Sequence, residues 1–347
     1  MSPFQRLDRL TRLPSSAYLA IATVIFAASN SLTRKIIEIG EAHLINGHNP
    51  ISPCNVLFVG NVCAFALLLP LCYQQCRPGV LQTLTRRDWG LMVLVASLSG
   101  ALAPALVFTA LGLTSVANVV LLSRLAPPLE LLYSFLLFGA VHNPWTIAGS
   151  LLSLVGVALT LLLDPSMPLH NPPQMLMVGR GELLTLGAAF VTALANVASR
   201  AGLQSIPTGL FSIFRNLVGA FIFFWLAIAL FGVDHFQEVS APFLWGWMVI
   251  YALVIVVIGQ FAWFVGIKNA PLSTIAVANA GSPLIAIAIA FLLLGEVPTQ
   301  AQYVGGWVIF IGILIGLKGS GRGTQSTAQS PLSPGKWLSL VPGFKGL

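Results

Sequence analysis

Charged residues are scarce in this chain, which excludes the ordinary soluble classes. Only 8% of its 347 residues are charged, whereas 56% are hydrophobic and the mean hydropathy is +0.89. A soluble domain needs far more charge to cover its surface. A membrane-spanning helix needs roughly 20 mainly apolar residues, and the chain holds many such runs. The composition therefore predicts a protein that crosses a membrane several times.

Cysteine is also scarce, and the familiar catalytic sequences are missing. The four cysteines form no CxxC pair and have no histidine at the spacing of a metal site. The chain contains no Walker-type loop, no HExxH and no GxSxG sequence. We therefore expect no enzyme activity, no metal and no cofactor. The lack of an ATP-binding loop favours a secondary carrier or a facilitator.

Ten apolar runs, separated by short polar, proline or glycine segments, predict an all-α membrane protein with ten transmembrane helices. The expected helices are 16–37, 55–74, 88–110, 117–138, 145–163, 182–202, 209–231, 243–267, 272–294 and 301–318. They divide the chain into a cytoplasmic N-terminal segment (1–15), a first five-helix repeat (16–163), an inter-repeat loop (164–181), a second five-helix repeat (182–318) and a disordered cytoplasmic tail (319–347).

We expect the chain to lie in the cell membrane, that is, an inner or plasma membrane. The basic residues predict its orientation there. The loop 232–242 has no Lys or Arg and carries Asp234 and Glu238. With the N-terminus inside, the inner segments hold Arg6, Arg9, Arg12, Arg77, Arg86, Arg87, Lys268, Lys318, Arg322, Lys336 and Lys345. Positive charge favours the cytoplasmic side, so both termini are expected there. This topology accounts for the net charge of +7, and we expect no nucleic-acid partner.

An internal repeat appears when the sequence is shifted by 156 residues. By our count about fourteen of the 68 positions from 89 to 156 are then identical. At this shift tryptophan aligns with tryptophan, proline with proline and glycine with glycine. This agreement is a stronger signal of a repeat than the number of identical positions. Matched residues include Trp89 with Trp245, Phe108 with Phe264, Pro127 with Pro283, Gly139 with Gly295, Gly149 with Gly305 and Gly156 with Gly312.

Five helices in each half have a physical consequence. A second copy of a unit with an odd number of spans enters the membrane from the opposite side. The halves are then inverted repeats, related by a pseudo-two-fold axis in the membrane plane, as is typical of transporters.

The stretches 110–163 and 266–317 resemble the drug/metabolite transporter superfamily, specifically its EamA-like ten-helix members. Each has a mid-span proline, a Phe-Leu-Leu-x-Gly ending and a helix with spaced glycines. Gly295-Glu296 matches the Gly-Glu of this family, whereas the first half departs with Gly139-Ala140. The resemblance implies a transporter whose central cavity is lined by helices one, three, four, six, eight and nine. It says little about the substrate.

Glu130 is the sharpest candidate for a functional residue. It shares one face of the fourth expected helix with Ser123, Pro127 and Ser134. A charge at the bilayer centre costs at least roughly 2.5–3.5 kcal/mol on insertion scales. Glu130 therefore either lines the cavity, where it would bind a cationic or amine group or carry a proton, or forms an ion pair with Arg124 or an arginine of another helix.

Asn30 on the first expected helix and Asn196 on the sixth each precede an arginine by four residues, Arg34 and Arg200. The asparagines either bind substrate or join helices by hydrogen bonds, worth about 0.6–2 kcal/mol. The arginines are expected to extend towards the membrane interface.

Several further residues are candidates for the cavity wall. Asn279 stands where the other half has Ser123, and Gln260 and Trp263 offer a hydrogen-bonding and a stacking surface. Pro127 and Pro283 either expose polar backbone in the cavity or simply kink their helices.

The leading hypothesis is a secondary transporter, expected to be an exporter, that moves a small metabolite or drug-like molecule by alternating access. The alternative is an integral-membrane enzyme or a receptor, for which no catalytic cluster or ligand domain is visible. The expected partners are a small-molecule substrate and the lipid bilayer, with homodimer formation left open.

Overall fold

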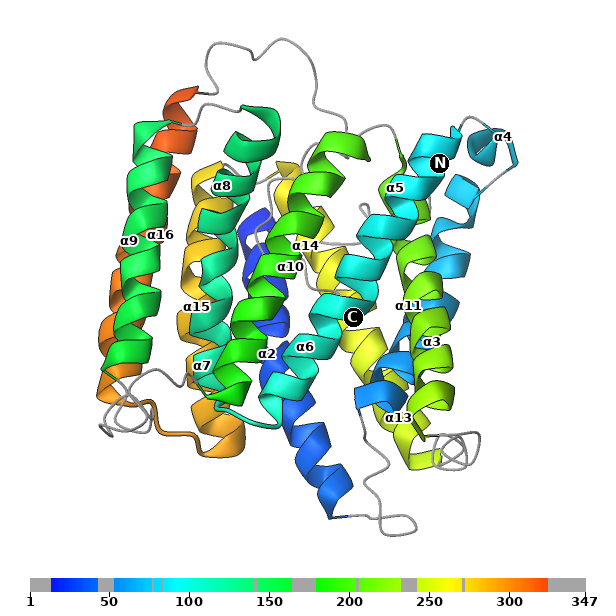
Figure 1. The fold of residues 1–347 in the computed structure, drawn as a ribbon, viewed down its shortest axis with the longest axis horizontal. Helices are drawn as coiled ribbons and strands as arrows, with labels where there is room; N and C mark the ends of the chain where they lie inside the picture. The colour runs from blue at the N-terminus through cyan, green and yellow to red at the C-terminus, as the bar shows by residue number, and fades with distance from the viewer. Residues whose placement is uncertain are drawn as a thin grey trace.

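The computed structural model of the chain describes residues 14–42, 53–76, 78–82, 84–139, 143–163, 179–203, 206–231, 242–269 and 272–323. Helices fill most of these ranges and no strand occurs in them. Figure 1 shows the helices standing side by side as a bundle.

The first half contains a succession of long helices and short connecting turns. Its elements are α2 (Ser15–Glu41), α3 (Pro53–Cys72), η1 (Tyr73–Cys76), α4 (Pro78–Leu81), α5 (Arg86–Ser97), η2 (Leu98–Leu102), α6 (Ala103–Leu111), α7 (Val116–Leu122), η3 (Ser123–Leu125), α8 (Ala126–Phe138) and α9 (Pro144–Leu162). The second half has α10 (Arg180–Gly202), α11 (Thr208–Phe231), α13 (Pro242–Tyr251), η7 (Ala252–Gly259), α14 (Gln260–Asn269), α15 (Leu272–Leu294) and α16 (Gln300–Gly323).

Local sequence explains where several helices begin and end. Thr85 and Asp88 form a capping box at the start of α5, which satisfies amides that have no partner within the helix. The Ser115 side chain caps α7 by accepting a hydrogen bond from the amide of Asn118. Gly139 and Gly295 end α8 and α15 with positive φ angles of 62° and 70°. Glycine adopts this left-handed conformation without the clash that a Cβ atom would cause.

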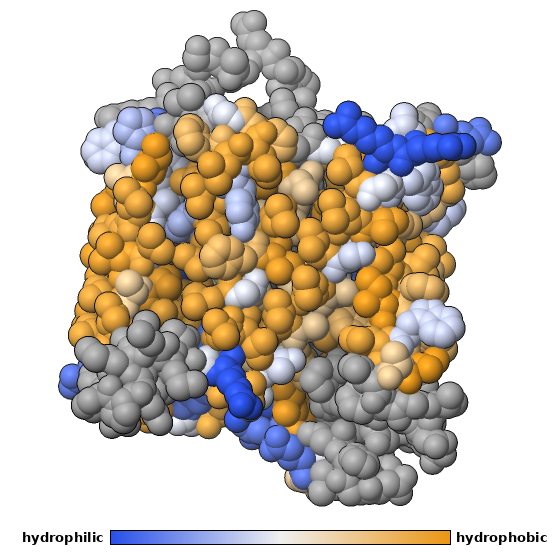
Figure 2. All heavy atoms as spheres, viewed as in Figure 1, coloured by the Kyte–Doolittle hydropathy of each residue, from blue (hydrophilic) through white to orange (hydrophobic). Residues whose placement is uncertain are grey.

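The helices have the length and composition of a membrane protein. Seven helical ranges are long and apolar enough to cross a bilayer: Ser15–Glu41, Arg86–Leu111, Val116–Phe138, Pro144–Leu162, Arg180–Arg200, Thr208–Ala229 and Gln300–Leu317. The shorter apolar helices are Asn55–Pro70, Leu244–Gly259 and Ala278–Leu294. Figure 2 shows apolar side chains across the middle of the visible face and hydrophilic ones gathered towards its upper and lower edges. The prediction of an all-helical, multi-pass membrane protein is confirmed.

Two of the long helices contain a wider turn that sequence analysis did not anticipate. The π-helical segment η2 connects α5 to α6, and the π-helical segment η7 connects α13 to α14. A π turn holds more residues than an α turn, so it changes which residues face a given side.

Helices from the two halves pack against each other in pairs. α2 contacts α14 and α15, while α10 contacts α6 and α8; α3 packs on α11, and α9 packs on α16.

The α9–α16 contact brings backbone onto backbone. A Cβ atom on Gly312 would lie 2.7 Å from the Gly149 carbonyl oxygen, and one on Gly156 would lie 2.8 Å from that of Gly305. Only glycine fits at such contacts, as expected for small-residue packing of membrane helices.

The last helix extends beyond the predicted range. α16 continues to Gly323, so the first residues of the predicted tail, 319–323, are helical. The rest of that tail, most of the N-terminal segment and most of the inter-repeat loop lie outside the described residues.

Candidate functional site

A cavity of about 200 Å³ lies between the two halves of the bundle. Its wall comes from α2, α6, α7, η3 and α8 of the first half and from α10, α13, α14 and α15 of the second, with single residues from α3 and η2. Apart from Leu57 of α3, the lining residues belong to the six helices that the family resemblance implied. Many of its lining side chains are polar: Thr23, Ser29, Asn30, Thr33, Ser99, Ser123, Arg124, Glu130, Thr192, Asn196, Tyr251, Asn279 and Ser282.

Glu130 lies in this wall and is held by two residues of α10. Its side chain is buried. One carboxylate oxygen accepts a hydrogen bond of 2.6 Å from the Asn196 amide, and the other pairs with the Arg200 guanidinium at 3.0 Å. The Arg200 side chain remains 40% exposed. Of the partners considered for Glu130, an arginine of another helix is the one observed.

Arg124, six residues before Glu130 and also in the cavity wall, lies in a different environment. Its guanidinium donates a hydrogen bond of 2.9 Å to the Ser282 hydroxyl of α15. Its Nε atom is buried and donates to no acceptor among the described residues. Arg124 therefore bridges the two halves through a neutral group.

The structure brings together most of the residues predicted for the site. Asn30, Ser123, Glu130, Asn196, Trp263, Asn279 and Pro127 all line the cavity. Gln260 is buried but is not among the lining residues. It follows directly after η7, where the π-helical turns shift the faces of the helix relative to an uninterrupted α-helix.

The two predicted prolines differ in their surroundings. Pro127 follows the short 3-10 segment η3 that interrupts the fourth predicted helix. Pro283 lies within the continuous helix α15 and does not line the cavity. Only the first of these prolines thus lies at a break in its helix and in the cavity wall.

A second polar cluster joins the starts of α7 and α10 to the start of α16. The Glu182 carboxylate accepts hydrogen bonds from the Thr114 hydroxyl and the Asn118 amide. The Gln302 amide donates to the Asn118 side-chain oxygen at 2.8 Å and to the Ser115 hydroxyl at 3.2 Å. Since Asn118 meets Glu182 near the helix starts and Glu130 meets Asn196 further on, α7–α8 and α10 run side by side in the same direction.

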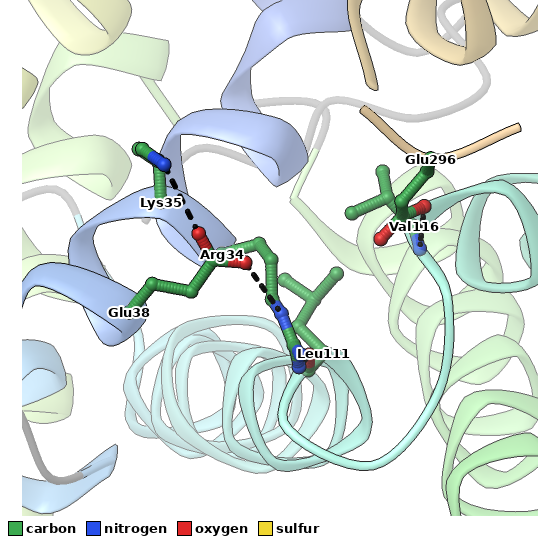
Figure 3. A network of polar contacts seen from close by, with 6 residues as sticks. All are labelled: Arg34, Lys35, Glu38, Leu111, Val116 and Glu296. Atoms are coloured by element: carbon green, nitrogen blue, oxygen red, sulfur yellow. Dashed lines mark hydrogen bonds and ion pairs between the residues drawn. The ribbon is translucent and has the colours of Figure 1, made fainter. Parts of the chain in front are cut away.

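Figure 3 shows a third set of contacts, around the C-terminal part of α2 and the start of α7. Arg34 donates to the carbonyl of Leu111 at the end of α6 and pairs with Glu38 at 3.5 Å. The Glu296 carboxylate accepts a hydrogen bond of 2.9 Å from the amide of Val116. An acidic group at a helix N-terminus also interacts favourably with the helix dipole, so the Gly-Glu sequence of the second half caps a helix of the first.

Burial raises the pKa of the Glu296 carboxyl above its ordinary value. Hydrogen bonds from the amides of Val116 and Ala117 and the charge of Arg34 act in the opposite direction, while the Glu38 charge adds to the rise. Desolvation of the charged form is therefore the dominant influence on this group.

Sequence reasoning missed the cluster around Glu182, Asn118 and Gln302. All three are buried, but each lies near the start of a helix, where a polar residue ordinarily meets water. Glu182 was the one available signal, because it is an acidic residue in the first turn of an expected span.

Comparison with known proteins agrees with this geometry. Residues 14–162 and 179–317 match the EamA-like transporter family. The chain is 42% identical over 339 residues to a Synechocystis protein named "Uncharacterized transporter sll1164", with 97% of each chain covered. It also superimposes with a TM-score of 0.55 on a solved structure described only as "Crystal structure of protein", which is 19% identical. That alignment covers 89% of this chain and 99% of the other, and it supports the fold alone.

Proposed function

Because the chain belongs to the EamA-like transporter family, we propose that it is a secondary transporter, with export as the expected direction, which moves a small metabolite or drug-like molecule by alternating access. The observation that carries this proposal is the polar cavity between the two halves of an apolar, membrane-type bundle. Binding sites of such carriers lie near the bilayer midplane, where two repeats meet. The proposed substrate-binding residues are those predicted ones that line the cavity: Asn30, Ser123, Glu130, Asn196, Trp263 and Asn279.

The proposal includes ten membrane spans in two inverted repeats. The three shorter apolar helices lie within α3, α13–η7–α14 and α15, and we propose that these also cross the bilayer. The packing pattern supports the symmetry: α2, the first helix of its half, contacts α14 and α15, and α10, the first helix of the other half, contacts α6 and α8. The pairs α3–α11 and α9–α16 join equivalent helices of the two halves.

The glycines of α9 and α16 support the same two-fold relation. The shift of 156 residues pairs Gly149 with Gly305 and Gly156 with Gly312. Gly149 approaches Gly312, and its equivalent Gly305 approaches Gly156. Such exchanged contacts are the signature of a two-fold interface, in which residue i meets j and j meets i.

Alternating access requires contacts between the halves that can separate. Glu296 and Gln302 of the second half reach Val116 and Asn118 of the first half. We propose that these polar contacts close the extracytoplasmic end of the cavity and break when the cavity opens to that side. With both termini in the cytoplasm, the starts of α7 and α10 lie at this end.

Reconstitution of the purified protein in liposomes tests the proposed function. A panel of small anionic, neutral and cationic metabolites is followed by mass spectrometry, with and without a pH gradient. We expect at least one compound to cross faster than in protein-free liposomes, and Glu130→Gln to slow it or change its pH dependence. Gly246→Ala is the matched control, because a Cβ atom there meets nothing within 4 Å. If no compound crosses faster than in protein-free liposomes, the proposal fails.

A further inference from the structure

We propose that the substrate carries an anionic group, a carboxylate or a phosphate, and that the guanidinium of Arg124 binds this group in the cavity. The inference rests on the proposed transport function, because it treats the cavity as the place where the substrate binds. It differs from the first interpretation of the sequence, in which Glu130 attracted a cation or an amine.

The first argument is the balance of charge around the cavity. Among the described lining residues, only Arg124 and Glu130 are charged. Glu130 is matched by Arg200 at 3.0 Å and by the Asn196 amide at 2.6 Å. No carboxylate in the described part of the chain pairs with Arg124, whose recorded partner is the Ser282 hydroxyl. The charge left uncompensated in the cavity is therefore positive.

The second argument concerns hydrogen-bond donors. Arginine and tryptophan nitrogens donate hydrogen bonds and accept none. The Arg124 Nε and Trp263 Nε1 atoms are both buried without an acceptor among the described residues, and both side chains line the cavity. The Thr192 hydroxyl is a third buried polar group without a partner in the described chain, on the same wall. Buried donors of this kind are costly unless a ligand supplies acceptors.

The third argument is the geometry of the guanidinium. The hydrogen bond to Ser282 ties one end of Arg124 to α15, which fixes the side chain across the gap between the halves. A planar guanidinium offers paired donors that fit carboxylate and phosphate oxygens. A cationic substrate would meet an uncompensated like charge in the same space, which is unfavourable.

The other lining residues indicate the character of the rest of the substrate. Phe26 and Trp263 lie with ring centroids 6.3 Å apart, and Phe108 also lines the cavity. These rings provide an apolar surface beside the cationic group. A volume of about 200 Å³ suits a small molecule, so the expected substrate is a small organic anion with an apolar portion.

The decisive experiment measures the sign of the charge in the cavity by thiol modification. Asn279 and Ala286 line the cavity and lie about one turn before and after Ser282 on α15. Each is replaced by cysteine in a full-length chain whose four native cysteines are replaced by alanine. The solubilised protein reacts with the anionic sulfonatoethyl, the cationic trimethylammonioethyl and the neutral methyl methanethiosulfonate. Rates are divided by those of a small free thiol, and the neutral reagent shows which site is reachable.

With Arg124 in place, we expect the anionic reagent to react on the order of tenfold faster than the cationic one. Arg124→Gln should bring the ratio towards one, and Arg124→Lys should keep most of it. Equal rates, a faster cationic reagent, or a ratio that Arg124→Gln leaves unchanged would overturn the proposal. The ratio measured with Arg124 present decides the sign even if Arg124→Gln does not fold.

The liposome panel separates this inference from the proposed function. Transport of anionic compounds that Arg124→Gln abolishes and Arg124→Lys partly retains supports both. Transport of only neutral or cationic compounds overturns the anion proposal and leaves the transport function standing. If nothing is transported, the proposed function fails, while the thiol measurement still decides whether the cavity favours anions.

Discussion

Residues 89–156 and 245–312 repeat several backbone features at a separation of 156 positions. The π-helical segment η2 has its counterpart within η7. Gly139 and Gly295 both end their helices in the left-handed conformation. The outward surface repeats as well, since Leu136 is 65% exposed and its equivalent Leu292 is 77% exposed. These shared features belong to the scaffold and to its lipid-facing side.

The charged side chains do not repeat. The positions equivalent to Arg124 and Glu130 are Ala280 and Ala286, and Ala286 also lines the cavity. The comparison teaches that packing constrains both halves alike, whereas the two charged residues of the cavity wall come from one half. Substitutions in the scaffold should therefore have matched effects in the two halves, and substitutions of cavity charges should not.

The largest expected effect is at the α9–α16 contact. Gly156→Val and Gly312→Val should each destabilise the protein by about 1–3 kcal/mol or more, because the added atoms would meet backbone that cannot move aside. Thermal unfolding in detergent measures this effect. Gly90→Ala and Gly246→Ala are equivalent positions with nothing within 4 Å of an added Cβ atom, and neither should destabilise. A large loss at only one of the two valine positions would contradict the proposed symmetry.

The next effect concerns the ion pair between Glu130 of the first half and Arg200 of the second. Glu130→Gln and Arg200→Gln should each destabilise, whereas the double variant should lose less than the sum of both. For contacting residues the expected coupling is about 0.5–3 kcal/mol, towards the lower end here because Arg200 is partly exposed and screened by solvent. The coupling is measured by a double-mutant cycle, in which the unfolding of the wild type, the two single variants and the double variant is compared. Strictly additive losses would show that the pair contributes no coupling.

A smaller and symmetric effect is expected at the two left-handed glycines. Gly139→Ala and Gly295→Ala should each cost about 1–2 kcal/mol, because an L-residue is strained at positive φ. Their surroundings hold nothing within 4 Å of an added Cβ atom, so the cost comes from the backbone alone. Unfolding temperatures of the two variants should fall by similar amounts; a neutral result at either would contradict this explanation.

The smallest effect is the pH dependence of the Glu296 cap. Its pKa is raised by burial, so the folded chain holds this proton at pH values where the unfolded chain has lost it. The contribution is complete below the unfolded pKa of about 4.3 and is lost as pH rises through the raised folded value. Wild type should therefore lose stability relative to Glu296→Gln across this window. Parallel unfolding temperatures of the two proteins from pH 4 upward would refute the shift.

The long helices could be predicted because each spanning segment must by itself be apolar enough and long enough to cross the bilayer. Both properties can be read from the local sequence. The all-helical expectation holds, and the helices with spaced glycines, α9 and α16, pack closely against each other. The π-helical segments could not be predicted, since no local residue marks them. Of the two candidates that follow η7, Trp263 lines the cavity and Gln260 does not.

The sequence indicated which residues line the candidate cavity, but it did not indicate which of them pair with one another. Polar residues within an apolar helix are easily recognised in the sequence, and most of the predicted ones line the cavity. Which arginine meets Glu130 depends on how distant helices pack. Arg124 is nearer in sequence, yet Arg200 of α10 is the partner. Because Arg200 pairs with Glu130, the proposed substrate is an anion instead of a cation.

The central claim is that two inverted halves close around one cavity, and the topology of the chain tests it most directly. Reporter sites at both termini and within residues 164–178 are probed on intact cells with a membrane-impermeant reagent. The account predicts that both termini lie in the cytoplasm and that the segment between the halves lies outside. A segment between the halves on the same side as the termini would contradict it.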